Sequence, residues 1–282
     1  LDNEKRRLDS ELNWYFKVGV SAALIMTILG IALLWHIRKL RQLRQEQQRL
    51  QQLIDYDSIT NMGTPLLLQK ELGQQLKMTW HPDSQGSTPT ATAMLLFRAQ
   101  GLTDLECRVG VKKAQSIQRQ VSHAIRQRMP EQSHYYLLPD RLLLCTLPDS
   151  AIDQYEEIII RIENRIGVIM RKYGLNERVI CGKVQYPFLT KSVNALKPLQ
   201  TLEICGIALA GAMQLSDRLC KNVWVELFAI DCQQAAFFNG ELRTKAIEAI
   251  TKGLVKVNHS EKQAQIDWNA LLVSPQGKNT LN

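Results

Sequence analysis

The sequence lacks the patterns that mark several common functional classes. No block of Lys and Arg is interleaved with aromatic residues, although the formal net charge is +8. Residues 1–55 hold nine Lys and Arg against six Asp and Glu, and the remaining surplus of +5 is spread thinly over the rest of the chain. Because a nucleic-acid-binding domain gathers its basic residues on one surface, we expect no nucleic acid partner.

Cysteine patterns with a chemical role are also missing. The six cysteines form no C-x-x-C pair and have no metal-ligand spacing with the five histidines. We therefore expect free, mostly buried thiols in a reducing compartment, with no metal site and no cofactor. No histidine is close in sequence to Cys107, so this residue is interpreted as a packing residue and not as a nucleophile.

The chain begins with Leu1 rather than Met, and its first residues are highly charged. Leu1, Leu8 and Leu12 fall on one helical face, so we interpret residues 1–17 as the extracytoplasmic end of a preceding helical domain. We expect the chain to be a fragment whose sensing part precedes Leu1. The residues present do not identify the stimulus.

A long uncharged stretch follows. Residues 18–35 contain no charged side chain, and a bilayer span needs about 20 predominantly apolar residues. The aromatic cluster Trp14-Tyr15-Phe16 precedes this stretch, as is typical of a membrane interface. A buried core helix and an uncleaved signal sequence are the alternatives, but the apolar part of a signal peptide is usually shorter and ends in a small-residue cleavage site. We therefore predict a transmembrane helix over 18–35.

The helix is expected to continue over residues 36–55 with a seven-residue apolar repeat. Such a repeat predicts the a and d positions of two heptads, with a polar residue at one a position that can fix the register. A solvated amphipathic helix has the same pattern, but a membrane span would hold two such helices close together. We therefore predict a parallel dimeric signalling helix. Its contact positions are Leu40, Leu43, Gln47, Leu50 and Ile54.

The remainder of the chain predicts a mixed order of helices and strands. Residues 57–64 read DSITNMGT, and Pro65 suits the first turn of a helix over 66–76. Residues 94–97 are a short apolar strand, and the capping-box pair Thr103 and Glu106 starts a helix. Two strands flank the turn pair at Pro139, and a helix capped by Asp149 or Ser150 follows them. Further strands are expected at 178–186, 223–228 and 254–257, with helices at 202–213 and 241–252.

This series, from about Asp57 to Phe228, resembles the GGDEF domain of the diguanylate cyclase family. The first motif is similar to Asp-x-Leu-Thr-Gly-Leu-x-Asn-Arg, and residues 205–213 are similar to Ala-Asp-x-Ala-Leu-Tyr-x-Ala-Lys. The resemblance implies an α/β fold of the nucleotidyl-cyclase palm type, a central mostly antiparallel sheet of about five strands with helices on both sides. We divide the chain into a degenerate GGDEF-like domain over 56–215 and a last strand with a C-terminal extension over 216–282.

The residues that the family uses for catalysis are replaced. Joining two GTP molecules requires metal ions on the phosphates, and such ions bind carboxylate oxygens. When the family's pattern is aligned with this sequence without gaps, its first two acids are replaced by Arg98 and Gln100. Its signature pentapeptide falls at residues 138–142, where Asp140 keeps one acid and Arg141 replaces another. The resemblance therefore implies a domain that is not an enzyme.

The replaced positions leave several local roles open. Arg98 could form a structural ion pair with Asp140 in place of the metal, or Arg98 and Arg141 could bind a phosphate directly through their guanidinium groups. The family's guanine-reading Asn and Asp become Glu106 and Gln115. These residues are our candidates for a nucleotide or phosphate site.

Together, these observations predict a single-pass protein of the bacterial inner membrane with its C-terminal domain in the cytoplasm. The charge difference across the predicted span is only one residue, so the orientation depends on the free cysteines and the resemblance. We expect a homodimer whose inactive GGDEF-like domain relays a periplasmic signal, with an unknown cytoplasmic protein as partner. The alternatives are a non-catalytic module that binds GTP or c-di-GMP and, less favoured, an active diguanylate cyclase.

Overall fold

The computed structural model describes Trp14, Met26 and residues 33–79, 92–102, 104–189, 196–229 and 240–273. The chain divides into two compact units, Leu1–Leu53 and Ile54–Asn282. Most of the predicted span over 18–35, and most of residues 1–17, lie outside the described residues. In the part of the chain that is described, no helix is long and apolar enough to cross a membrane.

Residues 33–55 form one continuous helix, as predicted for the signalling segment. The apolar side chains at the predicted contact positions are exposed in the single chain, from 45% for Leu40 to 56% for Ile54. Gln47 is exposed as well. The helix therefore has an uncovered apolar stripe of the kind that a second helix buries, and its pairing in a dimer stays a prediction.

The second unit is built on a six-stranded sheet in the order β2-β3-β1-β4-β5-β6. Neighbouring strands are antiparallel except β4 and β5, which are parallel. The sheet is therefore mostly antiparallel, as predicted, and it has one strand more than expected because β6 pairs with β5. The strands are β1 Thr92–Ala99, β2 His134–Leu137, β3 Leu143–Pro148, β4 Val179–Tyr186, β5 Val223–Ala229 and β6 Val255–His259.

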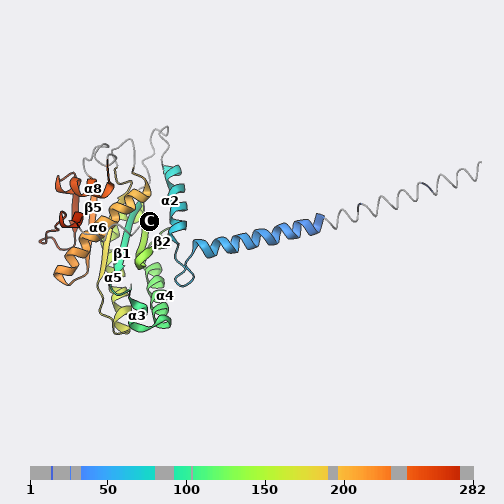
Figure 1. Cartoon of the computed structure of the whole chain (residues 1–282), viewed down its shortest axis with the longest axis horizontal. Coiled ribbons are helices and arrows are strands. Elements are labelled where there is room, and N and C mark those ends of the chain that lie inside the picture. The colour runs from blue at the N-terminus through green and yellow to red at the C-terminus, as the bar shows by residue number, and fades with distance from the viewer. Residues whose placement is uncertain are drawn as a thin grey trace, which may run out of the picture. The chain divides into compact units, whose positions relative to one another are not determined.

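Helices cover both faces of the sheet (Figure 1). Side chains alternate along β1, so that Met94 and Leu96 join one buried cluster while Leu95 and Phe97 join the other. The first cluster lies under α2, α6 and α8, and the second lies under α4 and α5. The helices are α2 Pro65–Thr79, α3 Leu105–Val109, α4 Val111–Arg128, α5 Tyr155–Lys172, α6 Pro198–Leu219, α8 Leu242–Thr251 and α9 Ala270–Val273.

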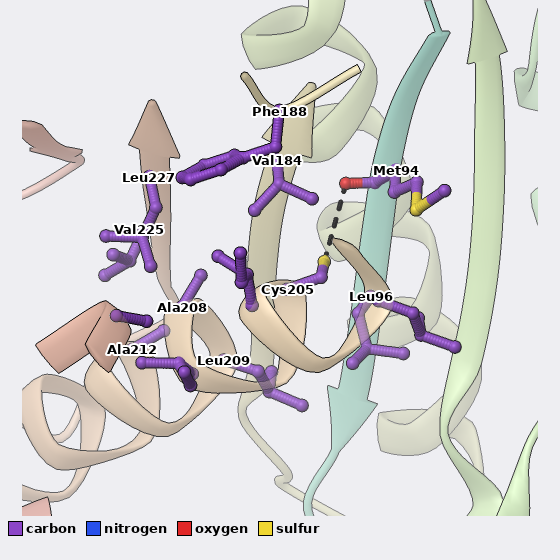
Figure 2. Packing of buried hydrophobic residues seen from close by; sticks show 14 of the residues in the cluster. Met94, Leu96, Val184, Phe188, Cys205, Ala208, Leu209, Ala212, Val225 and Leu227 are labelled. Carbon is purple, nitrogen blue, oxygen red and sulfur yellow. Dashed lines mark hydrogen bonds between the residues drawn. The ribbon is translucent and has the colours of Figure 1, made fainter. Parts of the chain in front are cut away.

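Helix α6 lies unusually close to the central strand β4. A Cβ atom placed on Gly182 would be 2.5 Å from the backbone nitrogen of Leu209 and 2.6 Å from the carbonyl oxygen of Cys205. Figure 2 shows Cys205 and Ala208 of α6 beside the strand residues that they pack against. The Cys205 thiol lies 3.6 Å from the carbonyl oxygen of Met94. Close helix–sheet packing at this point therefore depends on a residue without a side chain.

The N-terminal caps predicted for two helices are not found: one lies outside the described residues and the other was wrong. Thr103, the predicted capping residue, lies outside the described residues, and α3 has Asp104 at its N-cap position without a side-chain cap bond. Asp149 and Ser150 do not cap α5, because they begin a 3-10 turn, η2 Asp149–Gln154. Helix α5 starts only at Tyr155, and its predicted buried face is confirmed.

Candidate functional site

The β2–β3 turn contains the residues that the sequence comparison aligned with the family's signature motif. Residues 139–141 form a short 3-10 turn, η1 Pro139–Arg141, in which Asp140 and Arg141 have φ values of 57° and 58°. The Leu138 N–H donates to the Leu142 carbonyl at 2.8 Å and closes the hairpin. Two successive residues with a Cβ atom thus adopt the left-handed conformation that glycine adopts most easily.

Arg141 is anchored to the helices below this turn. Its guanidinium donates to a carboxylate oxygen of Glu106 in α3 at 2.9 Å and to Oε1 of Gln118 in α4 at 3.2 Å. The structure therefore brings together two of the predicted site residues, Arg141 and Glu106, as an ion pair. Both side chains remain partly exposed, Arg141 at 31% and Glu106 at 44%.

A small cavity lies beside this pair, lined by Arg141, Gln118 and Leu102 among others. Its volume of about 10 Å³ has room for about one water molecule. The side-chain nitrogen of Gln118 is buried without a hydrogen-bond partner among the described residues. The other guanine-reading candidate, Gln115, is half-buried on α4. This cavity is far too small for a nucleotide.

Arg98 does not form the predicted ion pair with Asp140. Its guanidinium lies against α6, with Nη1 3.6 Å from the sulfur of Met213, whereas Arg141 contacts α3 and α4. Since α6 and α4 cover opposite faces of the sheet, the contacts of the two arginines lie on opposite faces. The alternation of side chains along β1 puts Arg98 on the same face as Met94 and Leu96, so the strand pattern could have predicted this placement. Met213 stands where the family's pattern has Lys.

The end of β1 is closed by a polar network around Gln100. The Gln100 amide donates to a carboxylate oxygen of Asp217 at 3.0 Å and accepts from Arg178 at 2.8 Å. Arg178 also donates to Asp217 at 3.1 Å and to the Ser216 carbonyl. Sequence reasoning missed Arg178 and Asp217, because no motif marks them and only the packing of α6 beside β4 brings them to Gln100.

These positions do not fit a divalent cation of the kind the family uses. Of the four matching residues, only Asp140 has a carboxylate, and Arg98 brings a fixed positive charge to the end of β1. The nearby acids Glu106 and Asp217 are committed to Arg141 and Arg178. Among the described residues, no three His, Cys, Asp or Glu side chains gather where they could hold a metal ion.

The entry segment 57–64 forms a compact loop at the start of the domain. One carboxylate oxygen of Asp57 accepts from the Ile59 N–H at 3.1 Å, the Thr60 N–H at 2.7 Å and the Thr60 hydroxyl at 2.7 Å. Asp and Ser/Thr side chains commonly fix turns through such local bonds. Arg126 of α4 donates to the carbonyls of Thr60 and Asn61, which ties the loop to the domain.

The same loop is joined to the edge strand that leads into the β2–β3 turn. The Gly63 N–H donates to the Tyr135 carbonyl and its own carbonyl accepts from the Leu137 N–H, both at 2.8 Å. A Cβ atom on Gly63 would be 2.6 Å from the ring of Tyr136, so the contact requires glycine. The end of the signalling helix is held in turn, because Asp55 pairs with Lys70 of α2 at 2.7 Å.

No protein-family model matches the chain, and no curated protein matches it. Among solved structures, the coiled coil and GGDEF domain of DgcB from Caulobacter crescentus, in complex with c-di-GMP, is similar with a TM-score of 0.53 at 14% identity, covering 69% of this chain and 96% of that one. Diguanylate cyclase SiaD from Pseudomonas aeruginosa, in complex with its activator SiaC, has a TM-score of 0.48 at 11% identity, covering 75% and 76%.

A third similar structure, Vibrio cholerae LapD S helix-GGDEF-EAL bound to c-di-GMP, has a TM-score of 0.47 at 14% identity and covers 63% of this chain and 38% of that one. Likeness at such low identity concerns the fold. The DgcB comparison confirms the predicted GGDEF-type α/β fold for this chain.

Proposed function

We propose that this chain is a membrane-anchored bacterial signalling protein whose GGDEF-fold domain is catalytically inactive and relays a periplasmic signal to a cytoplasmic protein. One observation carries the proposal. At the positions where the family holds its metal and nucleotide, Arg98, Gln100 and Arg141 each bind another side chain of the domain. These interactions join different elements, so they stabilise the domain where an active cyclase keeps an open site.

The entry segment supports the relay part of the proposal. A helix that ends at Asp55 continues into a loop that is bonded to α2, to α4 and to the edge strand β2. We infer that a change in the packing of two such helices would reach the domain through these bonds. Such coupling requires an element with two states whose equilibrium is shifted by both the signal and the partner. The helix pair is the candidate for this element.

The catalytic part is tested by incubating the purified chain with GTP and Mg²⁺ or Mn²⁺ and measuring c-di-GMP. We expect no product above that of a buffer blank. Titration calorimetry with GTP and with c-di-GMP, each with and without Mg²⁺, tests the alternative of a binding module. We expect no heat of binding. Sustained synthesis of c-di-GMP would refute the proposal. Magnesium-dependent GTP binding would show that the contacts of Arg98, Gln100 and Arg141 open to admit the nucleotide.

The dimeric helix is tested by disulfide crosslinking in membranes. Leu43→Cys and Leu50→Cys lie at predicted contact positions, and Gln45→Cys and Gln52→Cys lie on the opposite side of the same helix. We expect the first pair to yield crosslinked dimers at native expression levels and the second pair to yield far fewer. Equal crosslinking at all four positions, or none, would contradict the coiled-coil part of the proposal.

A further inference from the structure

A polar groove adjoins the Gln100 network, with which it shares Arg178. It has a volume of about 320 Å³ and is formed by the second half of α5, the loop from α5 to β4, and the turn from α6 to β5. Pockets for small ligands are typically about 300–1,000 Å³, so the groove is large enough for a small metabolite. Sequence analysis assigned no role to any residue that lines it.

Glu163 lies at the buried side of the groove. The residue is 8% exposed, and its Oε1 atom is buried without a hydrogen-bond partner among the described residues. Burial raises the pKa of this carboxyl from 4.5 to about 8, because no neighbouring cation or donor offsets the lost hydration. A buried carboxyl in a hollow without a partner is costly for the fold, which points to a ligand that provides the missing donor.

Arg171 lies on the same face of α5, two turns beyond Glu163, and Gly167 lies between them. A Cβ atom on Gly167 would be 3.4 Å from Nη1 of Arg171, so the guanidinium extends back over the glycine. The Arg171 carbonyl accepts from the Gly174 N–H, but among the described residues its guanidinium has no ion pair or hydrogen bond. This face of α5 therefore has an acid without a partner, a gap at the glycine and a cation without a partner. Such a face can receive a molecule with two charged ends.

The remaining wall adds positive charge and amide groups. Lys221 contributes an ammonium that is 62% exposed and lies 3.6 Å from its nearest acid, Glu261. Asn222 uses its oxygen to accept from the Val179 N–H at 3.0 Å. The lining acid Glu177 is already paired with Arg108. Lys221 and the lining residue Arg178, which pairs with Asp217, are thus also in ion pairs, which leaves Arg171 as the lining cation without an acidic partner among the described residues.

We propose that this groove is a binding site for a small zwitterion, with the ammonium or another N–H donor of the ligand at Glu163 and its anionic group at Arg171 and Lys221. Charge-assisted hydrogen bonds at both ends would give the ligand orientation as well as affinity. The proposal does not depend on whether the GGDEF-fold domain is catalytic, since none of its residues belongs to the positions that the family uses for GTP.

Cys220 provides a direct readout, because it is exposed and lines the groove. The complete chain is alkylated with iodoacetamide, and modification of Cys220 is followed by peptide mass spectrometry. Cys107 is exposed on α3, does not line the groove, and serves as the internal control. The probe is 4-aminobutyrate, compared with butyrate and butylammonium, which carry one charged end each.

We expect 4-aminobutyrate to slow alkylation of Cys220 at least about tenfold more effectively than either half-molecule, the effect of one additional charge-assisted bond, and to leave Cys107 unchanged. Glu163→Gln should reduce its protection to that of butyrate, and Arg171→Gln to that of butylammonium. Gly167→Leu fills the gap between Glu163 and Arg171 and should abolish protection. The melting temperature of this variant is measured to establish that it folds.

Three results would overturn the proposal. Protection by butyrate equal to that by 4-aminobutyrate would leave a simple anion site, and equal protection by butylammonium would leave a simple cation site. No protection by any probe, with Glu163→Gln folding normally, would mean that the groove holds only water. Each result is independent of the GTP assays above, so the two proposals fail separately.

Discussion

Lys183 and Glu226 face each other across the parallel strands β4 and β5, with the Lys183 ammonium 2.5 Å from a carboxylate oxygen of Glu226. The Lys183 side chain is 3% exposed and lies 3.1 Å from the ring centre of Tyr155 on α5. The Tyr155 hydroxyl donates to the second oxygen of Glu226 at 2.9 Å. Burial lowers the pKa of Lys183, and the adjacent Glu226 opposes that shift.

This pair predicts a strong asymmetry between single and double substitutions. Lys183→Met leaves the half-buried Glu226 carboxylate without its cation, with hydrogen bonds from Tyr155 and Asn258 only, and we expect it to lower the free energy of unfolding by about 3–5 kcal/mol. Lys183→Met combined with Glu226→Leu removes both charges and should cost much less. Urea unfolding of both single variants and the double variant gives the coupling energy. Additive losses would show that the pair is not coupled.

Glu163 predicts a stability that depends on pH. Its pKa in the folded protein, about 8, lies above the ordinary value of 4.5, so the folded state holds a proton that the unfolded state has lost. The resulting stabilisation is fully present below pH 4.5 and is lost as the pH rises through 8. Between these values we expect a decline of at most about 1.4 kcal/mol per pH unit.

Glu163→Gln should flatten this decline, because the amide does not titrate. Glu157→Gln is the matched control on α5, since Glu157 is exposed and pairs with Arg161 one turn away. Unfolding in urea at pH 5, 6, 7 and 8 measures the slope for each variant. An unchanged slope in Glu163→Gln would mean that Glu163 ionises normally.

Two glycines near the α6–β4 contact predict opposite effects of the same change. Gly182→Ala would place a methyl group 2.5 Å from the backbone of α6, and backbone does not give way as a flexible side chain does. We expect a loss of at least about 3 kcal/mol, or failure to fold. Gly206→Ala, on α6 with nothing within 4 Å, should stabilise the helix by about 1 kcal/mol. Melting temperatures distinguish the two outcomes.

The β2–β3 turn predicts a gain from glycine at Asp140. The side chain is exposed, and the backbone has a φ of 57°. Asp140→Gly should stabilise the domain by roughly 0.5–1 kcal/mol, and Asp140→Val should destabilise it by at least as much, because a β-branched residue is strained there. Thermal unfolding of both variants provides the comparison. Equal stabilities would show that the turn relaxes.

Much of the fold could be predicted from the sequence because the relevant patterns are local. The apolar face of α5, from Ile158 to Met170, repeats at helical spacing and is buried as expected. The strand runs and the turn at Pro139 are also local and were placed correctly. The pairing of β6 with β5 was not expected, because a five-residue strand gives no sign of its partner.

The candidate site was less predictable, because its contacts join residues far apart in the chain. Arg141 meets Glu106 across 35 positions, and Gln100 meets Asp217 across 117. The expected pairing of Arg98 with Asp140 was wrong because charge alone suggested it, while the alternation along β1 puts the Arg98 side chain on the α6 face with Met94 and Leu96. Lys183 was overlooked within an apolar strand, since its partner Glu226 is 43 positions away.

The sheet order has a consequence for the chain during its synthesis. β4 lies between β1 and β5, and its partner on one side begins at Val223, after the whole of α6. A nascent or proteolysed chain that ends before Val223 would therefore present β4 as an unpaired edge of almost fully buried residues. Such an edge is a template for pairing with other chains, so shortened products should aggregate. The solubility of the domain thus depends on β5, which is synthesised after β4 and α6.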